Sequence, residues 1–151
     1  MTEKNLNIAK WIMLFAAIYN LLWGAVISLF PKLMLFGTEA GELGLIMVQC
    51  IGMLVGVYGI AYYFSSRDPK RYWPLILVGL LGKILGPLGA LFYLYQAKLP
   101  VDFLWTNLFN DLIWIPGFSW ILFHIFKHNP GIIQKDLGLS LKKQTENHIH
   151  A

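Results

Sequence analysis

The sequence predicts an all-α integral membrane protein, built as an antiparallel bundle of four transmembrane helices with both termini in the cytoplasm. Three observations support this fold class. The composition, 57% hydrophobic and only 13% charged, is too apolar for an ordinary soluble domain. Four apolar stretches of about 20 residues or more match the roughly 30 Å of bilayer hydrocarbon. Short polar connections separate them, so we place a membrane domain at residues 1–128 and a cytoplasmic tail at 129–151.

Prolines and aromatic residues mark the ends of the four stretches. The predicted spans are 11–30, 43–64, 72–95 and 103–126. Pro31 stops the first span, and Pro74 suits the first turn of the third. The second span ends in Tyr62, Tyr63 and Phe64, which are typical of a membrane interface. The first span lacks the short core and the small-residue cleavage site of a signal peptide, so we expect it to be retained.

The positive charges predict the orientation. Nine of the twelve Lys and Arg residues fall in the amino-terminal segment, the second connection and the tail. The first connection carries only Lys32 and the third only Lys98, and Lys83 lies inside a span. Because cationic loops stay in the cytoplasm, both termini are expected there, and an even number of spans agrees.

Two spans contain a full charge, Lys83 in the third and Asp111 in the fourth. A charge at the bilayer centre costs about 2.5–3.5 kcal/mol on insertion scales, so each needs a partner or a function. At a rise of about 1.5 Å per residue, Asp111 lies roughly 12 Å and Lys83 roughly 18 Å from the outer ends of their helices. A lysine stem covers that offset, and we therefore predict an ion pair inside the bundle.

Further polar residues gather at similar depths in the outer half. The candidate ligand-binding residues are Asn20, Gln49, Lys83, Asn107, Asn110, Asp111 and Trp114. On the fourth span, positions 107, 110, 111, 114 and 118 share one helical face. The amides also suit hydrogen bonding between helices without any ligand, and the charge pair suits a purely structural role.

Prolines and glycines refine this picture. Pro87 and Pro116 lack N–H groups, so we expect two kinks that free the carbonyls of Lys83 and Leu112. Two GxxxG steps, Gly52–Gly56 and Gly82–Gly86, are expected to let helix backbones approach closely.

Other classes of function find little support. Cys50 is the single cysteine, so neither an intrachain disulfide nor paired-thiol chemistry is available. The sequence contains no nucleotide-binding loop, nucleophile elbow or zinc-protease motif, and we expect no catalytic residues and no soluble-type enzyme. His124 and His128 have metal-ligand spacing without an acidic partner, and we expect no metal there. The scattered basic residues predict no nucleic-acid partner.

Two expectations concern the tail. Ile133, Leu137 and Leu141 lie on one side of a helix over residues 131–143, which could rest on the cytoplasmic leaflet or form a flexible tail. The terminal His148 and His150 lie in a polar segment and suggest no metal site.

Over residues 11–126 the chain resembles the small four-helix DoxX-like membrane proteins, in its size, topology and mixture of glycines, aromatics and a few buried polar residues. The resemblance implies a bacterial inner-membrane subunit or accessory protein, since some relatives are linked to quinone redox chemistry or respiratory complexes. No sequence motif of that family can be carried over to individual residues of this chain.

Three hypotheses follow. The leading one is a membrane protein that binds a small lipophilic or anionic ligand, a quinone-like molecule included, in an outer-half cavity around Lys83 and Asp111. A second is a proton-coupled transporter that works as a dimer. A third is a structural subunit of a membrane complex. Membrane lipids are expected partners in all three, and the cofactor is undetermined.

Overall fold

The structure is a computed structural model that describes residues 1–37 and 39–136. Every regular element in these residues is a helix. The elements are α1 (Glu3–Leu29), η1 (Pro31–Leu35), α2 (Glu42–Arg67), α3 (Trp73–Tyr95), α4 (Phe103–Asn110), η2 (Leu112–Trp114), α5 (Ile115–His128) and α6 (Ile132–Asp136). Four helical segments are long and apolar enough to cross a membrane, namely α1, α2, α3 and the segment Phe103–His128. The predicted four-helix architecture is confirmed at this level.

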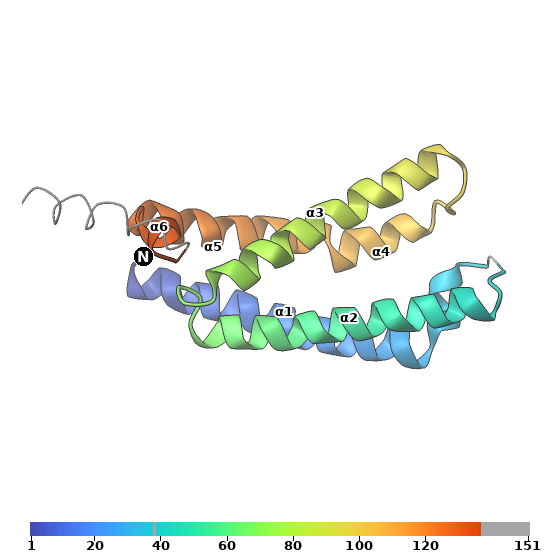
Figure 1. Cartoon of the computed structure of the whole chain (residues 1–151), viewed down its shortest axis with the longest axis horizontal. Coiled ribbons are helices and arrows are strands. Elements are labelled where there is room, and N and C mark those ends of the chain that lie inside the picture. The colour runs from blue at the N-terminus through green and yellow to red at the C-terminus, as the bar shows by residue number, and fades with distance from the viewer. Residues whose placement is uncertain (38, 137–151) are drawn as a thin grey trace, which may run out of the picture.

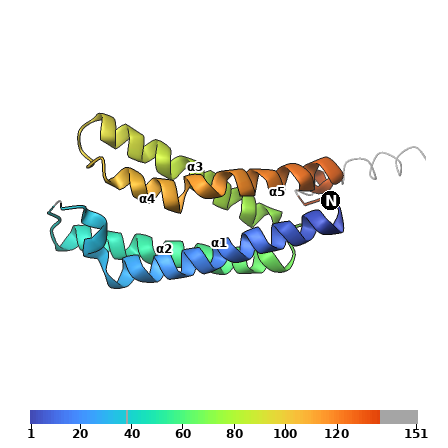
Figure 2. The same cartoon turned by 180° about the vertical axis from the view of Figure 1, so that it is seen from behind.

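The helices form two antiparallel pairs, α1 with α2 and α3 with the α4–α5 segment (Figures 1 and 2). The two pairs approach each other at the end that holds the amino terminus and α6. They diverge toward the opposite end, where the connections 30–41 and 96–102 lie. The start of the chain and α6 are therefore at the same end of the bundle. Helix α6 covers residues 132–136 of the expected tail helix. The other positions named in the tail lie outside the described residues, namely Leu137, Leu141, His148 and His150.

Helix α1 begins at Glu3, well before the predicted start at Trp11. Thr2 caps the helix, because its hydroxyl oxygen accepts a hydrogen bond from the Asn5 N–H at 3.3 Å. Glu3 in the first turn places a negative charge at the positive end of the helix dipole. These polar residues extend the helix beyond the apolar stretch.

Glycines bring α1 and α2 into backbone contact. A Cβ atom added to Gly24 would lie 2.5 Å from the Gly56 nitrogen, and one added to Gly52 would lie 2.7 Å from the Ser28 nitrogen. The close approach predicted at Gly52–Gly56 is confirmed. The corresponding prediction for Gly82–Gly86 is wrong: a Cβ at Gly82 would have no neighbour within 4 Å, and one at Gly86 would meet the Asp111 carboxylate.

A compact apolar core joins the two helix pairs where they approach. Its members include Ala9, Met13, Ala16, Tyr62, Ile76, Phe118, Ile121 and Ile125, all at most 1% exposed. The Tyr62 and Phe118 rings meet edge to face with centroids 5.1 Å apart. Many large apolar side chains on the outside, such as Leu22, Leu54 and Leu85, are exposed, as expected for surfaces that face lipid.

The fourth span is interrupted in its middle. Helix α4 ends at Asn110, one 3₁₀ turn follows, and α5 begins at Ile115 with Pro116 in its first turn. Because Pro116 cannot donate a hydrogen bond, the turn tightens. The Trp114 N–H donates to the Asp111 carbonyl at 3.1 Å, and the Ile115 N–H donates to the Leu112 carbonyl. The interruption near Pro116 was predicted, but the Leu112 carbonyl is not free. Helix α3 continues through Pro87 as one helix.

Candidate functional site

Lys83 and Asp111 meet inside the bundle. The Lys83 Nζ lies 3.3 Å from the Asp111 Oδ1, and the residues are only 6% and 8% exposed. The predicted ion pair between the third and fourth spans is confirmed. A buried pair of this kind offsets part of the cost of placing two charges in the hydrocarbon region.

The interruption of the fourth span supplies a second acceptor for Lys83. In a regular α-helix the Asn110 carbonyl would accept from the Trp114 N–H, but that N–H donates to Asp111 instead. The Lys83 ammonium donates to the Asn110 carbonyl. The cation thus lies at the carboxyl end of α4, the negative end of its dipole. The break in the helix therefore frees the carbonyl that Lys83 binds.

Two neighbours fix the Asp111 carboxylate. The Asn110 Nδ2 donates to Asp111 Oδ1 at 2.9 Å. On the other side, a Cβ added to Gly86 would lie 3.2 Å from Asp111 Oδ2, so the glycine makes room for the carboxylate against α3. Lys83 is thus held by two groups of the fourth span, and Asp111 is held by Lys83 and by its own neighbour Asn110.

Two hollows adjoin the ion pair. The first, which we call the Lys83 hollow, has a volume of about 260 Å³. It is lined by Asn20, Ile51, Val55, Tyr58, Tyr62, Gly79, Gly82, Lys83, Gly86, Asn110 and Asp111. All four spans contribute to this lining, which carries one cation and one anion.

The second hollow, the Trp23 hollow, has a volume of about 250 Å³ and extends toward the end where the helix pairs diverge. Its lining comprises Trp23, Ile27, Met34, Val48, Ile51, Val55, Gly86, Phe103, Thr106, Asn107, Asn110 and Asp111. Five of these residues also line the Lys83 hollow. Together the two hollows provide a volume in the range of about 300–1,000 Å³ that is typical of small-molecule sites.

Buried polar atoms without hydrogen-bond partners gather in this region. Among the described residues they are Trp23 Nε1, Asn107 Nδ2, Asn110 Oδ1 and Trp114 Nε1. An unpaired buried polar group costs about 1–3 kcal/mol, and native proteins contain few of them. Three of these four residues line the Trp23 hollow. A bound molecule that reaches these atoms would find two N–H donors and one carbonyl acceptor without partners.

The other predicted residues have different surroundings. Asn20 is buried in the lining of the Lys83 hollow, and its Nδ2 donates within α1 to the Ala16 carbonyl at 2.8 Å. Gln49 lines neither hollow; its Nε2 donates to the Ser28 carbonyl at 3.1 Å and joins α2 to α1. Trp114 packs against Tyr19, with ring centroids 5.4 Å apart.

The sequence-based selection missed Trp23, Tyr58 and Tyr62. Trp23 lies one helical turn beyond Asn20 on α1, and this spacing could have identified it, since a buried indole N–H needs a partner. The sequence pattern placed Tyr62 at the membrane interface and did not single out Tyr58. Tyr62 is instead 1% exposed, and its ring packs against Gly79, where an added Cβ would lie 2.5 Å from the hydroxyl oxygen.

The two histidines of α5 stack with ring centroids 6.2 Å apart. Each Nδ1 lies 2.9 Å from a carbonyl oxygen four residues earlier, Trp120 for His124 and His124 for His128. The described residues contain no group of three or more His, Cys, Asp or Glu side chains arranged to hold a metal ion.

Comparisons with known proteins find no matching family model, no similar curated protein and no similar solved structure.

Proposed function

We propose that this protein is a multi-pass membrane protein that binds a small lipophilic or anionic ligand in the hollows beside the Lys83–Asp111 pair. One observation carries the proposal: buried donors and acceptors without partners line the Trp23 hollow next to a charge pair that is already satisfied. A polar head of a ligand would supply the missing hydrogen bonds.

The residues have distinct roles in this proposal. The Lys83 ammonium uses two of its three N–H donors, on Asp111 and on the Asn110 carbonyl, and so retains one for a ligand oxygen. Asp111 keeps the ammonium charged when the site is empty. The indole of Trp23 and the amide of Asn107 orient the polar head, while apolar residues of α2 contact the rest of the molecule.

The cellular setting follows from the charge distribution and the resemblance. The cation-rich end, which holds the amino terminus and the connection between α2 and α3, faces the cytoplasm. The site then lies in the outer half of the membrane. The DoxX-like resemblance favours the bacterial inner membrane and an accessory role in a redox complex.

Extraction of bound molecules tests the proposal. The full chain is purified in mild detergent, and small molecules are extracted with organic solvent and quantified per chain by mass spectrometry. We expect one compound to be enriched in the wild type and several-fold reduced in Trp23→Phe and in the double variant Lys83→Met/Asp111→Leu. Trp11→Phe is the matched control, since Trp11 lies on the same helix and is 60% exposed.

Identical extracts from all four proteins would refute ligand binding and favour the structural role. A proton gradient that drives uptake of the compound into reconstituted vesicles would identify a transporter instead. Saturable binding without uptake supports the binding protein.

A further inference from the structure

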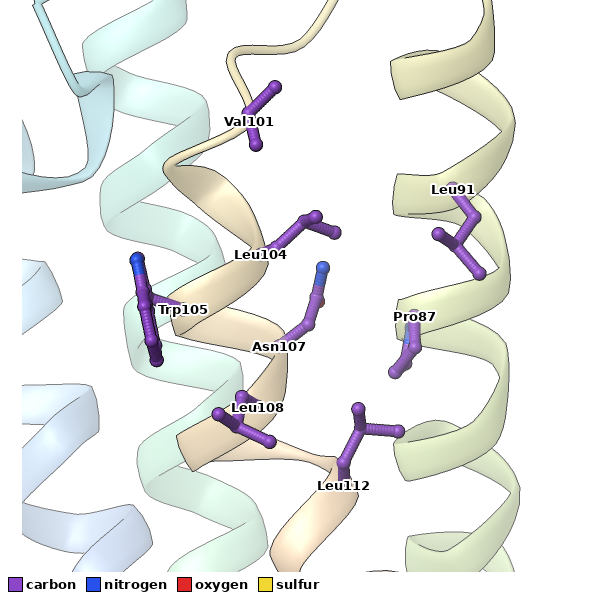
Figure 3. A pocket seen from close by; sticks show the side chains of 8 residues that line it. All are labelled: Pro87, Leu91, Val101, Leu104, Trp105, Asn107, Leu108 and Leu112. Carbon is purple, nitrogen blue, oxygen red and sulfur yellow. The ribbon is translucent and has the colours of Figure 1, made fainter.

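A third hollow lies between α3 and α4, with a volume of about 440 Å³ (Figure 3). We call it the α3–α4 groove. Its walls are apolar side chains such as Leu91, Leu104 and Leu108, and its lining contains one amide, Asn107. Leu91 on α3 is 52% exposed and Trp105 on α4 is 61% exposed, so the groove opens on the outer surface of the bundle, which faces lipid. A hydrocarbon chain can enter such a groove sideways from the bilayer.

Asn107 lies where the groove meets the Trp23 hollow, because it contributes to the lining of both. The residue is 6% exposed, and its Nδ2 has no hydrogen-bond partner among the described residues. Figure 3 shows its side chain in the space between α4 and α3, across from Pro87. An unpartnered donor at the junction of an apolar groove and a polar hollow is suited to the boundary between the chain and the head of an amphiphile.

The charges of the lining favour a neutral head. Lys83 and Asp111 are the charged residues that line the three hollows, and they neutralise each other. The groups left without partners are neutral: the indole of Trp23 and the amides of Asn107 and Asn110. An anionic head would place a second negative charge beside Asp111, and the single cation of Lys83 cannot neutralise both in this buried site.

We infer that the ligand is a neutral amphiphile with a single hydrocarbon chain, whose chain occupies the α3–α4 groove and whose oxygen-bearing head lies in the Trp23 hollow. Asn107 and Trp23 donate to oxygens of the head, and the Asn110 side-chain carbonyl accepts from a hydroxyl group. This inference rests on the proposed function and narrows its ligand to one chemical class.

Three probes with 18-carbon chains test the ligand class. They are 1-monooleoylglycerol, which is neutral with a carbonyl and hydroxyls, oleate, which is anionic, and 1-octadecene, which has no polar head. Dissociation constants are measured on the full detergent-solubilised chain by native mass spectrometry. We expect 1-monooleoylglycerol to bind about tenfold or more tightly than either other probe, because 1-octadecene forms no hydrogen bond and oleate adds a buried charge without a counter-ion.

Variants locate the two parts of the ligand. Asn107→Leu removes the donor and is expected to weaken 1-monooleoylglycerol binding about three- to tenfold, whereas Asn107→Gln keeps it largely intact. Leu108→Trp fills the groove and is expected to weaken binding about tenfold, the equivalent of roughly two methylene groups displaced. Leu85→Trp is the matched control, because Leu85 lies on the lipid-facing side of α3 outside the three hollows and is 63% exposed.

Each contrary result has a distinct meaning. Tighter binding of oleate that disappears in Lys83→Met/Asp111→Leu would overturn the neutral class and leave the proposed binding site in place. Equal binding by the wild type and Leu108→Trp would overturn the groove as the chain site. Binding of none of the three probes would overturn the inference altogether, and the extracted compounds would then decide the proposed function alone.

Discussion

At the scale of single residues, the ion pair explains why two charged side chains can lie in apolar spans. Lys83 and Asp111 are each nine-tenths buried, and each also has a hydrogen-bond partner beyond the other: the Asn110 carbonyl for Lys83, and the Asn110 amide for Asp111. Removing one partner of such a pair destabilises a protein more than replacing both with apolar residues, because the remaining partner is then a buried charge without a counter-ion. Stability measurements on single and double variants can therefore separate the energy of the ion pair from the cost of one unpaired buried charge.

We predict that Lys83→Met destabilises the protein by about 3–5 kcal/mol, since it leaves the Asp111 carboxylate unpaired. The double variant Lys83→Met/Asp111→Leu should recover most of that loss, because no charge remains buried. Equilibrium unfolding in mixed detergent micelles measures both values. Equal destabilisation by the single and double variants would show that the two side chains do not depend on each other.

At the scale of helices, the two halves of the bundle are built differently. Helices α1 and α2 touch through glycines over much of their length, whereas the fourth span is divided at Asp111 and leaves hollows against α3 and against the first pair. The tightly packed pair provides one wall of the hollows. The divided span frees the Asn110 carbonyl, which a continuous helix would have used internally.

Gly24→Ala tests the packing of the first pair. We expect a loss of about 1–3 kcal/mol in the free energy of unfolding, because the new methyl group would lie 2.5 Å from the Gly56 nitrogen. Gly56→Ala is the control: it brings the same gain in helix propensity, and its Cβ would have no neighbour within 4 Å. If the two substitutions changed stability equally, α1 and α2 would not be in backbone contact at Gly24.

Much of this architecture was predictable from local sequence, and the reasons are physical. Apolar length and proline positions place the four spans to within a few residues, except where the Thr2 cap extends α1 into polar sequence. Helical rise alone places Lys83 and Asp111 close enough to pair. Which carbonyl becomes free near Pro116 was not predictable, because it depends on the tight turn at Asp111 that Lys83 stabilises from another helix. Asn20, expected to bond between helices, instead donates within α1 to the Ala16 carbonyl.

At the scale of the whole molecule, the chain is a bundle whose pairs join at one end and diverge at the other (Figure 1). The apolar core with Tyr62 and Phe118 lies at the closed end, and the Trp23 hollow extends toward the open end. In the proposed orientation, with the cation-rich end in the cytoplasm, the divergent end faces outward. A ligand would then reach the site from the outer leaflet.

Cysteine labelling tests this orientation. In a Cys50→Ser background, Lys98→Cys in the connection between α3 and α4 should react with a membrane-impermeant maleimide added to intact cells. Lys70→Cys, between α2 and α3, should react only after the membrane is permeabilised. The reverse pattern of labelling would invert the proposed topology and place the hollows in the inner half of the membrane.

The most direct measurement of the central claim is the proximity of the two charged groups in a lipid bilayer. Solid-state NMR on protein in liposomes, labelled with ¹⁵N at the lysine Nζ and ¹³C at the aspartate Cγ, detects their dipolar coupling. The structure predicts a measurable coupling at the Lys83 signal that is lost in Asp111→Leu, because Nζ lies 3.3 Å from Oδ1 and therefore also close to the Cγ that carries it. A spectrum without that coupling would separate Lys83 from Asp111 and remove the basis of the proposed site.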